Sequence, residues 1–196
     1  GQFRFLRSSA PWLILAATLL ANGGVFCWYS YVNPVLTEVS GVEEEAMTAV
    51  MMLAGFGMFV GNLAGGRLSD RFTPARVARF FQGMIFFVLL GLFFLARIEW
   101  LAVSLMFLAT ASLFAVSSPQ QLLILENARG GEMLGAAFVQ IAFNLGNALG
   151  AWLGGVPIEC GLGVRWSALP GAAMALGGFA MFAIYCRRFG RPALSK

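Results

Sequence analysis

Uncharged polar and aromatic side chains that could bind a solute recur at helical spacing within long apolar segments. In residues 11–36 they follow one helical face at offsets of four, seven and eleven, and they are Asn22, Phe26, Tyr29 and Asn33. In residues 100–125 the pair is Ser117 and Gln121, and in residues 133–158 the stripe is Gln140, Asn144 and Asn147. The segments 78–97 and 166–187 carry almost none. The three polar segments therefore predict helices that line a cavity, and the two plain ones predict helices that face lipid.

Each amide or hydroxyl at membrane depth needs a hydrogen-bond partner or water. Three separate stripes favour a wet cavity that binds an uncharged or weakly polar small solute. Trp28 and Tyr29 are candidates to stack on an apolar ring face such as that of a sugar. Two alternatives stay open: a non-transporting scaffold or assembly protein, whose stripes bind partner helices, and a channel subunit.

The chain lacks most of the residues on which catalysis and cofactor binding depend. It has no histidine, which removes nucleophiles activated by imidazole and the usual zinc sites. Its single lysine, Lys196, is the last residue, so neither a phosphate-binding loop nor a Schiff base is available. All nine acidic residues fall between the apolar segments, and the three cysteines have unrelated spacings. We therefore expect no enzymatic activity, no cofactor and no metal site.

The elements that must position these side chains follow from the distribution of charge. Hydrophobic residues make up 59% of the 196 residues and charged residues 11%, against about 25% charge in soluble domains. Six apolar segments approach or exceed the roughly 17 to 25 residues that span hydrocarbon, and they lack the period-two alternation of barrel strands. We expect an all-α integral membrane protein with a cytoplasmic linker end at 1–10 and a cytoplasmic tail at 188–196. The expected spans are 11–36, 46–66, 78–97, 100–125, 133–158 and 166–187.

Basic residues decide the expected orientation. With the N-terminus inside, eleven of the thirteen lysines and arginines lie on the cytoplasmic side, and only Arg97 and Arg165 lie outside. This bias over short loops predicts that both termini are cytoplasmic. The net charge of +4 is then a topology signal. It does not indicate a nucleic-acid partner, because the cations are spread over separate loops, and we expect membrane lipid as the surrounding partner.

Two ladders of glycine at four-residue spacing mark helices that approach closely. The ladders are Gly57, Gly61 and Gly65 in the second apolar segment, and Gly146, Gly150 and Gly154 in the fifth. If segments one to three and four to six are inverted repeats, the ladders occupy corresponding positions, as in transporters. The alternative is ordinary close packing in a helix bundle, where glycine is common.

The connection after the second segment carries a charged motif that runs from Gly66 to Arg76, with the sequence GRLSDRFTPAR. It resembles the G-x-L-x-D-R-x-x-x-R loop of the major facilitator superfamily. The residues 5–26, 130–137 and 140–146 are similar to the C-terminal half of AraJ-type permeases, which are sugar-efflux members of the drug and proton antiporter group. The resemblance covers essentially the whole chain.

The resemblance implies helices seven to twelve of a twelve-helix, proton-coupled exporter of the bacterial inner membrane. In that family two halves rock around a midplane site, helices seven, eight, ten and eleven face the cavity, and the N-terminal six-helix half is the expected partner. Four residues match the gating loop, in which an acid and a base latch the cytoplasmic gate, and they are Gly66, Asp70, Arg71 and Arg76. Phe72-Thr73-Pro74 departs from the family pattern. The alternative is that these arginines only enforce topology.

Overall fold

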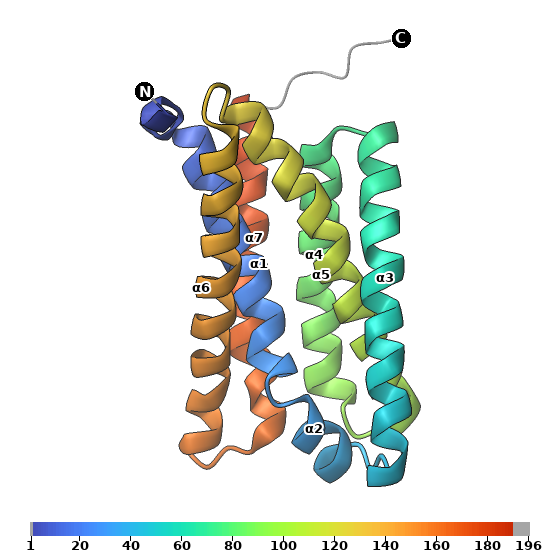
Figure 1. The fold of residues 1–196 in the computed structure, drawn as a ribbon. Coiled ribbons are helices and arrows are strands. Elements are labelled where there is room, and N and C mark those ends of the chain that lie inside the picture. Colours follow the sequence, from blue (N-terminus) through green and yellow to red (C-terminus); the bar gives the residue numbers. More distant parts are fainter. Residues whose placement is uncertain (1, 190–196) are drawn as a thin grey trace.

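Six long helices form an upright bundle in the computed structural model, which describes residues 2–189 (Figure 1). They are α1 (Ser9–Tyr29), α3 (Met47–Arg71), α4 (Pro74–Leu95), α5 (Glu99–Asn127), α6 (Glu132–Glu159) and α7 (Ala168–Phe189). Each is long and apolar enough to cross a membrane, and the described residues contain no strand. The expected all-α architecture with six spans is therefore confirmed. Residues 190–196 of the expected tail lie outside the described residues.

Short helical turns precede or connect the long helices. They are η1 (Gln2–Arg7), α2 (Val32–Pro34), the π-helical η2 (Val35–Val39), η3 (Glu44–Ala46) and η4 (Val164–Ser167). The beginning of α1 and the end of α7 lie at the same end of the bundle, as do the α3–α4 and α5–α6 connections (Figure 1). This common end is called the upper end below.

The first helix ends at Tyr29, whereas the sequence predicted one span over 11–36. The cause is Pro34, which has no N–H to donate to the carbonyl of Ser30 and whose ring disfavours a continuous helix there. The chain turns at residues 30–31, and Tyr31 N–H donates to the Trp28 carbonyl at 2.9 Å. Asn33 therefore lies beyond the break and outside the face that continues from Asn22.

The connection between α3 and α4 is shorter than the sequence predicted, because α3 continues to Arg71 and α4 begins at Pro74. Pro74 occupies the first helical position, where its missing N–H costs nothing. It also restricts the preceding Thr73 to extended backbone, with a ψ value of 134°. Phe72 before it is extended as well, with a ψ value of 167°. Most of the expected gating loop is thus helical.

Both glycine ladders lie where two helices meet backbone to backbone. A side chain at Gly61 or Gly65 would overlap the backbone of Ala111 or Ala115 on α5. On the other side of the bundle, Gly146, Gly150 and Gly154 lie against Leu19, Gly23 and Cys27 of α1. In both pairs the residue numbers rise together, so the paired helices run parallel. The second span packs on the fourth and the fifth packs on the first, which is the exchange that an inverted repeat produces.

We expect Gly61→Ala to destabilise the bundle, because the new methyl group meets the backbone of Ala111 and the two helices must separate. Overpacking of this kind costs about 1–3 kcal/mol. Gly55→Ala is the matched control on the same helix, because the space beside Gly55 is empty within 4 Å. Thermal unfolding in detergent should show a lower Tm for Gly61→Ala and an unchanged or higher Tm for Gly55→Ala. Equal Tm values would contradict the close contact.

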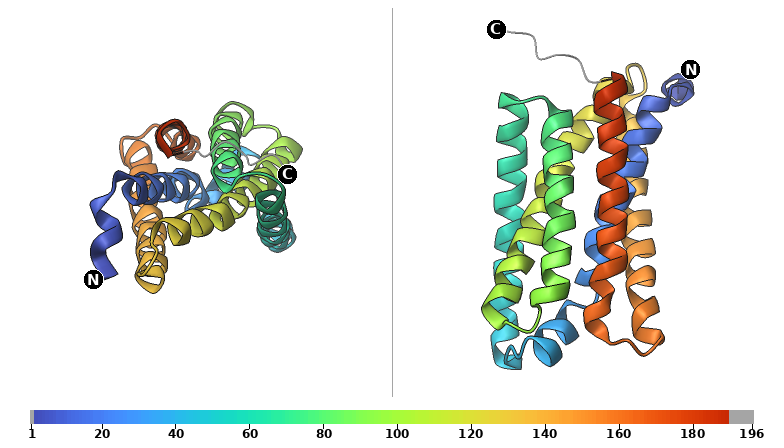
Figure 2. Two further views of the ribbon diagram at one scale, coloured as in Figure 1. Left: turned by 90° about the horizontal axis from the view of Figure 1, so that it is seen from above. Right: turned by 180° about the vertical axis from the view of Figure 1, so that it is seen from behind.

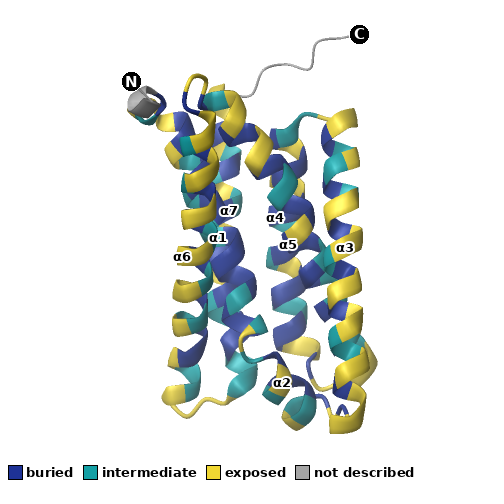
Figure 3. Cartoon of the chain, in the orientation of Figure 1, coloured by how far each residue is buried: buried dark blue, intermediate teal, exposed yellow. Residues whose placement is uncertain are grey.

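The helices differ in how much of their surface the bundle covers. In the most apolar stretch of each helix, 67% of α1 is buried, against 22% for the α3 span and 28% for α6. Figure 3 shows the resulting exposed faces of α3 and α6. The helices α4 and α7 lie side by side behind α1 and α5 (Figure 2). An outward stripe on α4, Phe80, Phe87 and Phe94, presents a continuous apolar surface.

Candidate functional site

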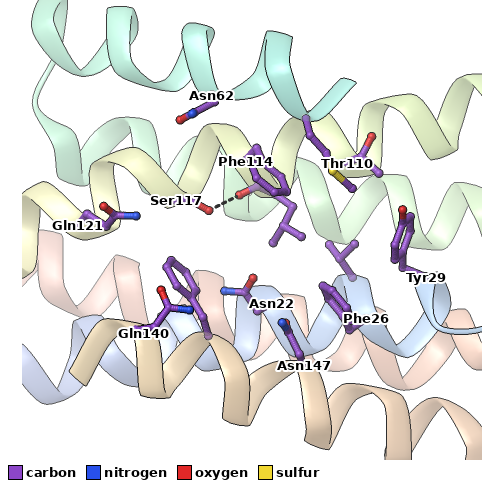
Figure 4. A pocket seen from close by; sticks show the side chains of 14 residues that line it. Asn22, Phe26, Tyr29, Asn62, Thr110, Phe114, Ser117, Gln121, Gln140 and Asn147 are labelled. Carbon is purple, nitrogen blue, oxygen red and sulfur yellow. Dashed lines mark hydrogen bonds between the residues drawn. The ribbon is translucent and has the colours of Figure 1, made fainter. Parts of the chain in front are cut away.

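A cavity of about 370 Å³ lies between α1, α3, α5 and α6 (Figure 4). Each of these four helices contributes to its wall, and neither α4 nor α7 does. Its lining residues are Asn22, Val25, Phe26, Tyr29, Met58, Asn62, Thr110, Leu113, Phe114, Ser117, Gln121, Gln140, Phe143 and Asn147. The volume is within the range of small-molecule pockets, roughly 300 to 1,000 Å³.

Seven of the ten side chains that the sequence singled out line this cavity together: Asn22, Phe26, Tyr29, Ser117, Gln121, Gln140 and Asn147. They come from three helices that are far apart in the sequence. The rings of Phe26 and Tyr29 pack edge to face, with centroids 5.7 Å apart. The helical periodicity therefore placed most of the candidate residues on the side of their helices that faces this cavity.

The other three candidates lie elsewhere. Trp28 does not line the cavity; it is fully buried, and its Nε1 has no hydrogen-bond partner among the described residues. Asn33 is exposed beyond the break in the first span. Asn144 is exposed beside the cavity, and its Nδ2 donates to the Gln140 carbonyl at 2.9 Å. On α6 the lining positions are Gln140, Phe143 and Asn147, at offsets of three and seven.

Sequence reasoning missed the contribution of α3, which places Met58 and Asn62 in the wall. A signal was present, because Asn62 is the one amide side chain in the apolar segment 46–66. Because glycines lie on either side of Asn62, this segment was interpreted only as a helix that packs closely on a neighbour. The structure gives Asn62 a partner on α5, since Ser118 Oγ donates to Asn62 Oδ1 at 2.9 Å.

The cavity is polar without being charged. None of its lining residues is an acid or a base, and its polar groups are amides, hydroxyls and a phenol. Apolar and aromatic side chains fill the rest of the wall, including Phe114 and Phe143. Such a wall offers directional hydrogen bonds and flat apolar contacts, but it offers no ion pair to a charged ligand. The arrangement is suited to a neutral solute with polar substituents.

The residues of the expected gating motif lie at the upper end of the bundle. Gly66, Asp70 and Arg71 belong to the last turns of α3, and Arg76 belongs to the first turn of α4. Asp70, Arg71 and Arg76 are exposed, and Asp70 forms no ion pair with another described residue. The space beside Gly66 is empty. These three charged side chains are therefore accessible from outside the bundle.

Comparison with known proteins gives independent evidence on the family of this chain. The model of the Major Facilitator Superfamily matches residues 2–151. The chain is 48% identical over 186 residues to AraJ of Escherichia coli (strain K12), whose name describes a transporter, covering 95% of this chain and 47% of that protein. It is 35% identical to the inner membrane transport protein YdhP of the same organism, covering 91% and 45%.

A third relative, named "Probable sugar efflux transporter", comes from Haemophilus influenzae (strain ATCC 51907 / DSM 11121 / KW20 / Rd). It is 26% identical over 171 residues, with 87% of this chain and 42% of that protein covered. The chain spans about half the length of the curated relatives it matches. All three relatives are named as transporters, which agrees with the expectation that the chain is not an enzyme.

Proposed function

Because this chain belongs to the Major Facilitator Superfamily, we propose that it forms the C-terminal half of a twelve-helix transporter. The solute is a sugar or a small drug-like molecule, exported by proton-coupled alternating access between two halves. The relatives support this proposal, since they are about twice as long and include a named sugar efflux transporter.

The observation that carries the proposal is the uncharged polar cavity between α1, α3, α5 and α6. A neutral solute with hydroxyl groups finds amide and hydroxyl partners there, and an apolar ring face finds Phe26 and Tyr29. Since no carboxylate lines this cavity, the group that carries the coupled proton belongs to the other half.

The exposed faces of α3 and α6 support the same proposal. They carry large apolar side chains outside the bundle, among them Phe56 and Phe59 on α3 and Leu145 and Trp152 on α6. We assign these faces to contact with the N-terminal half, which closes the cavity from the side. Membrane lipid covers α4 and α7, where the stripe of phenylalanines points outward.

The proposed membrane is the bacterial inner membrane, with the upper end of the bundle in the cytoplasm. Arg67, Arg71, Arg76 and Arg79 lie at this end, and they follow the positive-inside rule. A reporter fused after Lys196 should be active only in the cytoplasm. Activity in the periplasm would contradict the orientation.

A scan of single cysteines along α6 tests whether the cavity is filled with water. In a background with Cys27, Cys160 and Cys186 replaced by alanine, we expect a membrane-impermeant thiol reagent to label the assembled protein at positions 140, 143 and 147. Positions 141 and 145 serve as controls on the same helix, because they are exposed to lipid or to the other half rather than to the cavity. If the reagent labels none of the three cavity positions, the result would favour the alternative that the protein is a non-transporting scaffold.

A further inference from the structure

Three cavity side chains on α1 and α5 each donate a hydrogen bond to a carbonyl of their own helix. Asn22 Nδ2 donates to the Thr18 carbonyl at 3.1 Å, and Ser117 Oγ donates to the Leu113 carbonyl at 2.9 Å. Thr110 Oγ1 lies 3.0 Å from the Phe107 carbonyl in the same arrangement. A hydroxyl has one proton to donate, so Ser117 and Thr110 keep only acceptor capacity toward the cavity.

The direction of the Asn22 amide is fixed by the same contact. If the amide were reversed, Oδ1 would face the Thr18 carbonyl, and two acceptors without a proton would repel each other. Asn22 is only 6% exposed, and its Oδ1 accepts no hydrogen bond from another described residue. Figure 4 shows this oxygen pointing away from α1 toward α5. We call the unpaired acceptor oxygens of Asn22, Thr110 and Ser117 the acceptor wall, beside which Asn22 keeps one further N–H.

The Asn62 amide on α3 has the opposite polarity. Asn62 Oδ1 accepts the proton of Ser118 Oγ, which leaves the Nδ2 donors of Asn62 free. Asn147 Oδ1 is buried without a hydrogen-bond partner among the described residues, while its nitrogen points into the cavity in Figure 4. We call the Asn62 amide nitrogen the donor wall, because no hydrogen bond within the described residues fixes the direction of the Asn147 amide. The glutamines Gln121 and Gln140 lie toward one end of the cavity, and no hydrogen bond within the described residues fixes their side-chain amides.

We propose that these two walls select a neutral, polyhydroxylated solute by the polarity of its groups, an inference that rests on the proposed transport function. A hydroxyl group both donates and accepts, so it can give its proton to the acceptor wall and receive one from the donor wall. A solute with acceptors alone, such as a carboxylate, an ether or a ketone, leaves the Asn22 oxygen buried and unpaired. One unpaired buried group of this kind lowers affinity by about tenfold or more.

The test compares a sugar with analogues that have lost one donor at a time. Aldopentoses, aldohexoses and their deoxyfluoro analogues are the probes, because fluorine is close to a hydroxyl in size but cannot donate. In vesicles that contain both halves of the transporter, we expect at least one analogue to show a half-saturation concentration about tenfold or more above that of its parent sugar. In Asn22→Leu this difference should shrink, because variant and analogue remove the two ends of one hydrogen bond.

Two further variants keep the test decisive. Ser117→Ala removes another acceptor of the same wall, so it makes the same comparison if Asn22→Leu does not insert. Ser104→Ala is the matched control, because Ser104 Oγ donates to the Trp100 carbonyl of the same helix at 2.7 Å but lies outside the cavity. It should retain the full discrimination of the wild type.

The outcomes separate the two proposals. Equal transport of parent sugars and fluorinated analogues, or discrimination unchanged in both Asn22→Leu and Ser117→Ala, would overturn the polarity selection and leave transport standing. Export of solutes that lack donors in preference to sugars would do the same. No flux of any solute from a correctly inserted assembly would contradict the proposed function and this inference with it.

Discussion

Vesicles that contain this chain together with the N-terminal six-helix half are expected to move solute, whereas vesicles that contain this chain alone are not. Four helices of this chain line the cavity. This chain alone does not close the cavity on the side where α3 and α6 are exposed. Alternating access needs two bodies that move against each other around the site. We therefore expect transport activity to be lost completely when the N-terminal half is absent.

The measurement is the flux of labelled solute into vesicles made with this chain, with the other half, or with both. Insertion of each half is checked separately, because membrane helices are stable individually before they associate. Co-expression of the halves as separate chains should restore flux. Flux with this chain alone would indicate that two copies assemble into a transporter, which would contradict the assignment as one half.

In the assembled protein, Asp70→Asn should impair transport and leave insertion intact. Asp70 lies in the last turn of α3, where the negative end of the helix dipole disfavours a carboxylate. Its position is explained if the carboxylate faces the N-terminus of a helix in the other half, an interaction worth about 0.3–2 kcal/mol. Loss of that contact would shift the ratio of inward-open to outward-open states by up to about thirtyfold, toward inward-open.

A reporter cysteine at position 121, in the cavity wall on α5, measures this shift. We expect faster labelling from the cytoplasm in the Asp70→Asn background than in the wild type. Glu126→Gln is the matched control, because Glu126 is also an exposed acid in the last turn of a helix at the same end of the bundle. Equal labelling with normal transport would show that Asp70 has no role in gating.

The number and type of the helices could be predicted from the sequence, because charges in a membrane protein gather at the ends of the spans. The ends themselves were less predictable. Pro34 breaks the first span at Tyr29 although the residues beyond it remain apolar. Conversely, α3 extends through Asp70 and Arg71, because charged side chains at the membrane surface do not stop a helix. Hydropathy indicates which residues can lie within the membrane, whereas the residues at which a helix begins and ends depend on local backbone chemistry.

The candidate cavity was predictable to the extent that a single helix determines it. Helical spacing places Asn22, Phe26 and Tyr29 on one face, and these side chains meet in the cavity. Either Asn144 or Phe143 can line the cavity beside Gln140, depending on how α6 is rotated about its axis. The close contact between the glycines of α6 and the backbone of α1 sets this rotation. The contribution of Asn62 depends on how α3 packs on α5. Pairings between distant helices cannot be derived from spacing within one helix.

Protection of a cysteine at position 147 by the transported solute is the most direct test of the central claim that this cavity is the transport site. Asn147 lines the cavity from α6, and the control is the native Cys160, which is exposed at the end of the same helix and does not line the cavity. In the assembled protein, a saturating concentration of the exported solute should slow the labelling at position 147 and leave the labelling of Cys160 unaffected. If transport persists while the solute gives no protection at position 147, the solute binds elsewhere and the assignment of this cavity is wrong.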